Sequence, residues 1–244
     1  MFSPFRRIRH ALLEENKLRR YLAYALGEVL LIVFGILIAL QLESWRQQDA
    51  NASLQRLYLR ELLDDLDADV RRAGSWLDRY EGKVAGLEAA KQFYYGQIEN
   101  TGDAGLLRRI SYGAVGSRGQ LLGESPTFED LVSTGNLSLL SDIDIKKETL
   151  RYYVNRDFLQ EYSESLRSDY ATYVNATYPF DPQNPEAVDS RDLVGVLSRF
   201  RHEAFIGLIN QELTYAHTLR GAVERQVADA ENLRDRLNTY LNAR

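Results

Sequence analysis

The chain has 244 residues, of which 45% are hydrophobic and 27% charged, and it carries a formal net charge of −5. It contains no cysteine and only three histidines, which excludes disulfide frameworks, thiolate zinc sites, iron–sulfur clusters and cysteine nucleophiles. The acidic balance argues against a nucleic-acid partner. With five prolines and 16 glycines, the chain has few turn formers for a β-sandwich or barrel, so we expect an all-α fold.

An apolar stretch follows a basic start. Residues 1–20 hold six Lys or Arg side chains against two Glu, and the only charged side chain in residues 21–42 is Glu28. About 20 apolar residues span a bilayer core as a helix. We therefore divide the chain into a basic cytoplasmic amphipathic segment (1–20), a transmembrane helix (21–42) and a third region, 43–244.

Aromatic anchors and the charge bias set the expected topology. Tyr21 and Tyr24 at one end and Trp45 at the other are placed as interface anchors. Lys and Arg are more frequent before the apolar stretch than after it, so we expect a cytoplasmic N-terminus and a periplasmic region 43–244. A cleaved signal peptide is the alternative, but the sequence around Ala39 makes a poor cleavage site.

The basic segment is expected to lie on the membrane surface. Its Ser-Pro start predicts a helix, on which apolar residues share a face flanked by basic ones, as in helices that bind anionic lipids. A disordered tail that only sets topology is the alternative. The side chains expected at cytoplasmic lipid headgroups are Arg6, Arg7, Arg9, Arg19 and Arg20.

Small residues recur within the apolar stretch. Ala23, Gly27, Gly35 and Ala39 are spaced by multiples of four, a pattern that lets another membrane helix approach closely. Glu28 is costly in lipid unless it is protonated, paired or turned to water. We expect it to bond a neighbouring helix or reach the headgroups. A proton or ion pathway is the alternative, although such pathways generally use several carboxyls.

The third region reads as long helices. Leu59, Leu66 and Ala73 begin a seven-residue repeat, interleaved with Leu63, Val70, Leu77 and Val84, that predicts a helix continuous with the span and ending near Gln97. Residues 98–125 contain a short helix and then a glycine-rich stretch, expected to be a mobile loop. Helices are next expected from Ser125 to Gly135, from a Ser141 cap to Tyr178, and from a Ser190 cap to about Leu241, with a break near residue 200. Several long helices with short connections predict one antiparallel bundle.

No sequence pattern is complete enough to indicate a catalytic or metal-binding site. His202 and Glu203 begin like a zinc-protease motif, but Ile206 replaces the second histidine. Asp65, Asp67 and Asp69 resemble half of a calcium loop but lack its glycine and its glutamate, so we expect them on a solvated helix face. The tyrosines of residues 152–178 are expected in the core and at interfaces. We expect no enzyme activity, cofactor or metal.

The span also resembles a domain-of-unknown-function family of bacterial single-span membrane proteins. The resemblance lies in a basic start, Glu15-Asn16-Lys17, the run Gly27-Glu28-Val29-Leu30-Leu31 ending in Gly35-Ile36-Leu37-Ile38-Ala39-Leu40-Gln41, and Trp45. A second stretch, from Thr127 to Leu137 and then Leu150-Arg151-Tyr152-Tyr153, is similar to the same family. The likeness covers roughly residues 4–155. It implies a bacterial inner-membrane location and this topology, and it implies no activity.

These observations predict a non-catalytic accessory or scaffold subunit. It would dock on a larger membrane complex, such as electron-transfer or light-harvesting machinery, through its span and its periplasmic helices. The expected partners are other membrane-protein subunits or further copies of the chain, together with the lipid bilayer. The alternative is a periplasmic ligand-sensing bundle that signals through a partner protein. An enzyme would require a cluster of polar side chains that the sequence does not reveal.

Overall fold

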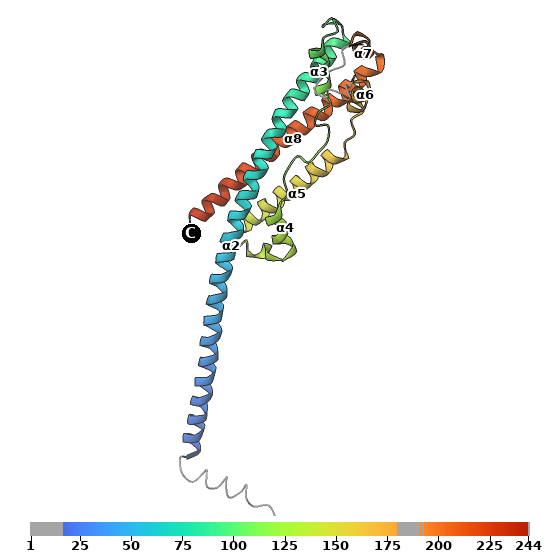
Figure 1. Ribbon diagram of the computed structural model, residues 1–244. Helices are drawn as coiled ribbons and strands as arrows, with labels where there is room; N and C mark the ends of the chain where they lie inside the picture. Colours follow the sequence, from blue (N-terminus) through green and yellow to red (C-terminus); the bar gives the residue numbers. More distant parts are fainter. Residues whose placement is uncertain (1–16, 180–190, 192, 244) are drawn as a thin grey trace, which may run out of the picture. The chain divides into compact units, whose positions relative to one another are not determined.

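The computed structural model describes residues 17–179, 191 and 193–243 (Figure 1). Those residues form helices and connecting segments, without strands. The helices are α2 (Lys17–Tyr94), α3 (Ala104–Tyr112), α4 (Pro126–Ser133), the 3₁₀ helix η1 (Asn136–Leu139), α5 (Ile143–Ser165), α6 (Asp169–Thr177), α7 (Leu193–Arg199) and α8 (Glu203–Asn242).

The chain divides into two compact units, Met1–Gln55 and Arg56–Arg244. Among the described residues of the chain, one helix, Tyr24–Tyr94, is long and apolar enough to cross a membrane. Its most apolar window has a mean hydropathy of 2.4, and none of that window is buried. The expected all-α class and the apolar helix are thereby confirmed. The criterion is one of length and composition, which a signal sequence near an N-terminus also meets.

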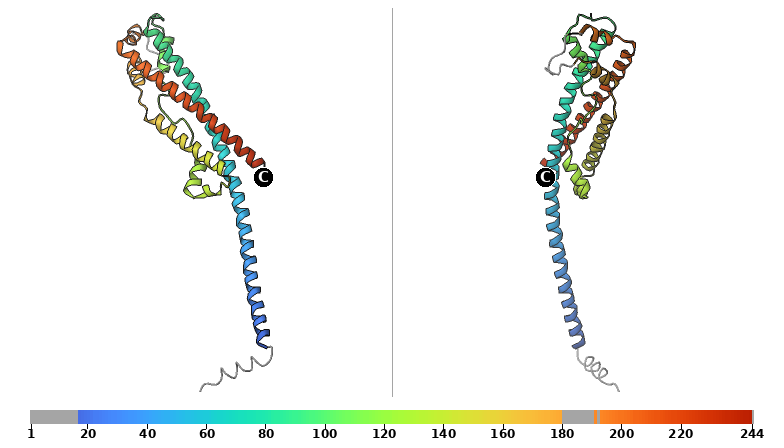
Figure 2. Two further views of the ribbon diagram at one scale, coloured as in Figure 1. Left: turned by 180° about the vertical axis from the view of Figure 1, so that it is seen from behind. Right: turned by 45° about the vertical axis from the view of Figure 1, so that its right-hand side comes forward.

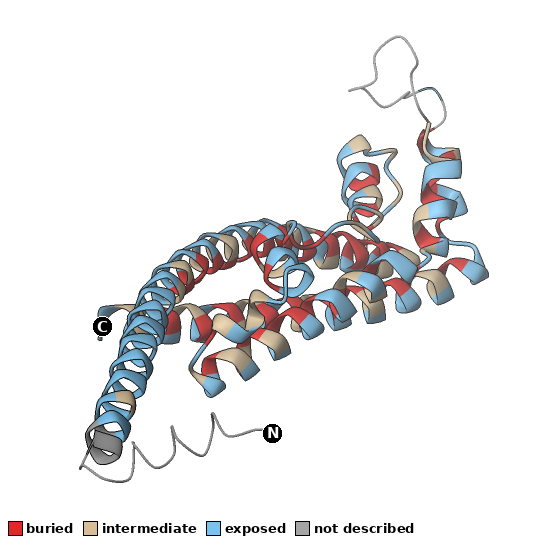
Figure 3. Ribbon diagram, turned by 90° about the horizontal axis from the view of Figure 1, so that it is seen from below, coloured by how far each residue is buried: buried red, intermediate tan, exposed pale blue. Residues whose placement is uncertain are grey.

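Helices α2, α5 and α8 supply most of the core of the second unit, and their buried residues lie on the faces that meet (Figure 3). On α2 and α8 the buried positions alternate in steps of three and four, the spacing of coiled-coil seams. The buried positions on α2 that follow this spacing are Leu59, Leu62, Leu66, Asp69, Ala73, Trp76, Tyr80, Lys83, Leu87 and Ala90. Those on α8 are Phe205, Ile209, Glu212, Ala216, Leu219, Val223, Gln226, Ala230, Leu233 and Leu237.

This register corrects the predicted one. The repeat of seven that contains Leu59 and Leu66 is buried as expected, but the interleaved Leu63 and Val70 are only partly buried. Their neighbours, one residue earlier, face the core instead. The difference matters because this shift brings charged residues into the seam.

The chain between residues 141 and 179 also differs from the prediction of one helix. Asp142, rather than Ser141, caps α5, since its carboxylate accepts hydrogen bonds from the N–H groups of Asp144 and Ile145. Helix α5 ends at Ser165, and Ser168 caps a separate helix, α6. The predicted Ser190 cap lies outside the described residues. The expected break near residue 200 is present between α7 and α8.

Contacts between the long helices fix their directions. Helices α2 and α5 run in the same direction, because residues 69–76 of α2 contact the same segments, in the same order, as Arg156 and Gln160 of α5. Helix α8 runs in the opposite direction, because its residue numbers rise where those of α2 and α5 fall. Thus Glu212 bonds Lys83 whereas Arg234 bonds Asp67. In both views of Figure 2, α8 runs alongside the later part of α2, and α5 runs alongside α8.

Candidate functional site

The predicted membrane residues lie on the exposed surface of α2. Tyr21, Tyr24 and Trp45 are 68%, 75% and 57% exposed. A Cβ added to Gly27 or Gly35 would meet no atom within 4 Å, so both leave open space for another helix. Also exposed on α2 are Glu28 and Ala39. The side chains of Ala23, Arg19 and Arg20, and all of Arg6, Arg7 and Arg9, lie outside the described residues.

Helical geometry sorts these residues into two faces. At about 100° per residue, Gly35 and Ala39 fall about 20° to either side of Glu28. Gly27 falls about 100° away from Glu28 around the same helix. A partner helix that approaches along Gly35 and Ala39 would therefore also pass the carboxyl group of Glu28.

In the second unit, a buried ion pair joins α2 to α8. The Nζ atom of Lys83 lies 2.5 Å from Oε1 of Glu212, and both side chains are 1% exposed. Lys83 also donates to the Ser117 hydroxyl at 2.8 Å and to the Val115 carbonyl at 3.2 Å. Burial lowers the pKa of Lys83, and the adjacent Glu212 opposes that shift.

Glu212 is equally well bonded. Its Oε1 accepts the Ser117 hydroxyl at 2.7 Å and its Oε2 accepts the Ser168 hydroxyl at 2.6 Å. We name Lys83, Glu212, Ser117 and Ser168 the lysine cluster. Because all three ammonium protons and both carboxylate oxygens are engaged, the cluster holds α2, α8, the glycine-rich segment and the start of α6 together.

A second buried cluster joins α2 to α5. Asp69 accepts hydrogen bonds from Nε of Arg156 at 2.9 Å and from the Tyr152 hydroxyl at 2.8 Å. Its other oxygen accepts the Gly123 N–H at 3.1 Å, and Arg156 donates to the Gly123 carbonyl. Asp69 is 2% exposed, so its expected place on a solvated face is wrong. We name these four residues the aspartate cluster.

Both clusters hold the glycine-rich segment, residues 113–123, against the core. Trp76 donates its indole N–H to the Gln120 carbonyl at 3.1 Å. Gly116 and Gly119 have positive φ angles of 64° and 155°, and a Cβ on Gly116 would lie 2.9 Å from the Trp76 ring. Leu121 is fully buried. The segment is packed onto the core, in contrast to the expected mobile loop.

Four tyrosines contribute hydroxyl groups to this interior. Burial is the main reason that the pKa of each is raised above its ordinary value, and nearby carboxylates add to the shift. We call them the core tyrosines: Tyr80, Tyr152, Tyr153 and Tyr170. The burial of Tyr152, Tyr153 and Tyr170 agrees with the expectation that the tyrosines of residues 152–178 contribute to the core.

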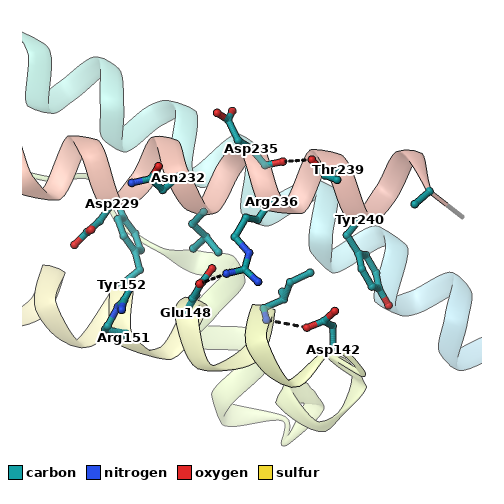
Figure 4. A pocket seen from close by; sticks show the side chains of 13 residues that line it. Asp142, Glu148, Arg151, Tyr152, Asp229, Asn232, Asp235, Arg236, Thr239 and Tyr240 are labelled. Atoms are coloured by element: carbon teal, nitrogen blue, oxygen red, sulfur yellow. Dashed lines mark hydrogen bonds and ion pairs between the residues drawn. The ribbon is translucent and has the colours of Figure 1, made fainter.

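Clefts open beside both clusters. One of about 650 Å³ lies between the start of α5 and the end of α8, where Arg236 reaches across to Glu148 (Figure 4). Another, of about 700 Å³, is lined by Ser117 and Ser168 of the lysine cluster together with Arg118 and Arg167. Within the described ranges, no group of three or more His, Asp or Glu is placed to hold a metal ion.

Sequence reasoning missed the charged residues and the serines of both clusters. Asp69, Lys83 and Glu212 occupy seam positions of their helices, flanked three or four residues away by apolar residues. That placement is the signal that could have identified them. Ser117 and Ser168 carry no comparable signal, because each lies in a segment whose course depends on tertiary contacts.

Comparison of the chain with protein-family models, with curated proteins and with solved structures finds no match. Its similarity to a family of single-span membrane proteins therefore stays a prediction from the two motifs.

Proposed function

We propose that the chain is a non-catalytic, single-pass accessory subunit of a bacterial inner-membrane complex. Residues 21–42 cross the bilayer with the N-terminus in the cytoplasm. The unit Arg56–Arg244 lies in the periplasm as a helical bundle in which α8 is antiparallel to α2 and α5. The partners are other membrane-protein subunits, and the family resemblance is part of the proposal.

The observation that carries the proposal is the fully exposed apolar window of α2. Soluble proteins rarely expose a continuous apolar surface of this extent, and lipid is the solvent that would cover it. The face that combines Glu28 with Gly35 and Ala39 supports a helical partner within the membrane, because small residues permit close approach and a carboxyl group in lipid gains from a hydrogen-bonding partner.

The hydrogen bonding of the second unit supports a scaffold role over a chemical one. In the lysine cluster, Lys83 is surrounded by three acceptors and Glu212 by three donors. A general base or nucleophile needs a free lone pair directed at a substrate. These groups instead stabilise the arrangement of the helices.

Blue-native electrophoresis of membranes solubilised in a mild detergent tests the proposal. We expect the chain to migrate in a complex several times its 28.0 kDa mass. The substitution Gly35→Leu, which fills the small-residue face, should weaken that complex. Migration of the native chain as a monomer at every detergent concentration would contradict the proposal.

A ligand-sensing bundle is the second candidate, and the cleft beside the lysine cluster favours it. Two arginines, Arg118 and Arg167, line that cleft. A small molecule bound there would rigidify the junction between α5 and α6. A ligand-dependent increase in the melting temperature of the full chain would support this candidate, and its loss in the variant Arg167→Gln would locate the site.

A further inference from the structure

The cleft beside the lysine cluster brings together two arginines from distant parts of the sequence. Arg118 belongs to the glycine-rich segment, and Arg167 lies between α5 and α6. Both side chains are exposed. Within the part of the chain that the structure describes, neither guanidinium forms a hydrogen bond or an ion pair. Two like charges that line one cleft repel each other, and an anion between them would turn that repulsion into two attractions.

The backbone at both arginines is held in place by the core. Each arginine is the sequence neighbour of a serine of the lysine cluster. Ser117 donates to Oε1 of Glu212 at 2.7 Å, and Ser168 donates to Oε2 of the same side chain at 2.6 Å. Both sides of the cleft are therefore attached to one buried carboxylate. A site whose parts are already in place loses less conformational entropy when a ligand binds.

The lining of this cleft favours a small polar ligand. Its volume of about 700 Å³ is within the ordinary range for small-molecule sites. Among the described residues that line it, none is aromatic or carries a large apolar side chain, and Thr172 and Asn175 add further hydrogen-bonding groups. An acyl chain or the apolar face of a partner helix would find little to pack against here. Recognition would depend on charge and hydrogen bonds.

Charge decides the kind of polar ligand. Arg118 and Arg167 bring two positive charges to the lining, and Asp169 brings one negative charge, so the cleft favours anions. A carboxylate has two oxygens, which a single guanidinium can satisfy in a bidentate pair. A phosphate group has more oxygens and close to two negative charges, so it can accept hydrogen bonds from both guanidinium groups at once.

We propose that this cleft binds a small, water-soluble molecule through a phosphate group held between Arg118 and Arg167. The inference rests on the second candidate function, the ligand-sensing bundle, and names the chemical class of its ligand. Asp169 opposes the phosphate and sets an upper limit on its affinity. The lysine cluster positions the two arginines and does not contact the ligand, because its own polar groups are bonded to one another.

Isothermal titration calorimetry of the full chain in detergent tests the inference with inorganic phosphate as the probe. The titration is made at a pH of about 8, where phosphate carries close to two charges, and at an ionic strength fixed with sodium chloride. We expect saturable binding with a Kd below about 1 mM. Acetate, which offers a single carboxylate, should bind at least about tenfold more weakly.

Three matched variants separate a built site from general attraction of anions. Arg118→Gln and Arg167→Gln should each raise the Kd for phosphate about tenfold, since each removes charge-assisted hydrogen bonds. Asp169→Asn should lower the Kd about two- to fivefold, because it removes a repulsion near the surface. The control Arg108→Gln removes the same charge from an exposed position of α3 and should leave the Kd unchanged.

Several results would overturn the inference. They are an absence of saturable phosphate binding, acetate binding as tight as that of phosphate, and phosphate binding that neither arginine variant weakens. Circular dichroism verifies the folding of each variant. If the arginine variants unfold, the effect of Asp169→Asn decides, and an affinity that stays the same or falls in that variant would overturn the inference.

Calorimetry and the earlier experiments fail independently. If phosphate does not bind but another small molecule raises the melting temperature of the chain, the inference fails and the ligand-sensing candidate stands. If phosphate binds while the native chain migrates alone in blue-native electrophoresis, the inference stands and the accessory role fails.

Discussion

Removing the buried cation of the lysine cluster should destabilise the second unit severely. Lys83→Met keeps most of the volume of the side chain but leaves Glu212 buried and without its ionic partner. At the observed 2.5 Å, the attraction between the charges is about 7 kcal/mol for an effective dielectric constant of about 20. Desolvation offsets part of this attraction, and removal of one partner of a buried pair typically costs about 3–5 kcal/mol. We expect a loss of that size in the free energy of unfolding.

Urea unfolding of the full chain in detergent, followed by far-ultraviolet circular dichroism, measures this loss. The double variant Lys83→Met, Glu212→Leu should recover most of it, because no buried charge remains. The control Arg220→Met breaks an ion pair on α8 whose side chains are 42% and 51% exposed, and it should cost less than about 1 kcal/mol. A cost for Lys83→Met no larger than that of the control would refute the reasoning.

Three further predictions concern close packing, ionisation and the span. Gly86→Ala should destabilise the second unit by about 1–3 kcal/mol, because the new Cβ would lie 2.4 Å from the Arg109 carbonyl oxygen. Gly74→Ala meets no atom within 4 Å and should stabilise it by about 0.5–1 kcal/mol. Equal effects of the two variants on urea unfolding would contradict this prediction. Because the pKa of each core tyrosine is raised, the stability that these residues give below a pH of about 10 is lost as pH rises further. The ultraviolet signal of their ionisation should therefore appear only together with alkaline unfolding. Ionisation of all tyrosines in the folded chain would disprove this prediction. Gly35→Leu should weaken the native complex in blue-native electrophoresis more than Gly27→Leu, which makes the same change about 80° away around the same helix. Equal loss would rule out close approach at Gly35.

The secondary structure was largely predictable because its signals are local. A continuous apolar run and a long heptad repeat identify α2, and Pro126 and Asp103 mark where α4 and α3 begin. The break between α5 and α6 was not predictable in the same way. Residues 166–168 contain no Pro or Gly. In the structure Ser168 caps α6 and donates its hydroxyl to the buried Glu212, a tertiary contact that the sequence does not show.

The buried clusters were hidden by an assumption about register. Choosing Leu63 and Val70 as seam residues gave an entirely apolar stripe, which is the ordinary expectation for a core. The structure instead buries Asp69 and Lys83 one position away, where each finds an oppositely charged partner on another helix. A single sequence does not reveal partners that lie more than 80 residues away, so the polar interior could be recognised only from the three-dimensional packing.

Membrane topology is the central claim, and cysteine labelling tests it most directly. The chain contains no cysteine, so the single substitutions Ser3→Cys and Asn242→Cys each introduce one unique label site. With a membrane-impermeant maleimide on intact spheroplasts, we predict labelling of Asn242→Cys at once and of Ser3→Cys only after lysis. Labelling of Ser3→Cys in intact cells, protection of Asn242→Cys until lysis, or a mature chain from which position 3 has been removed would contradict the account.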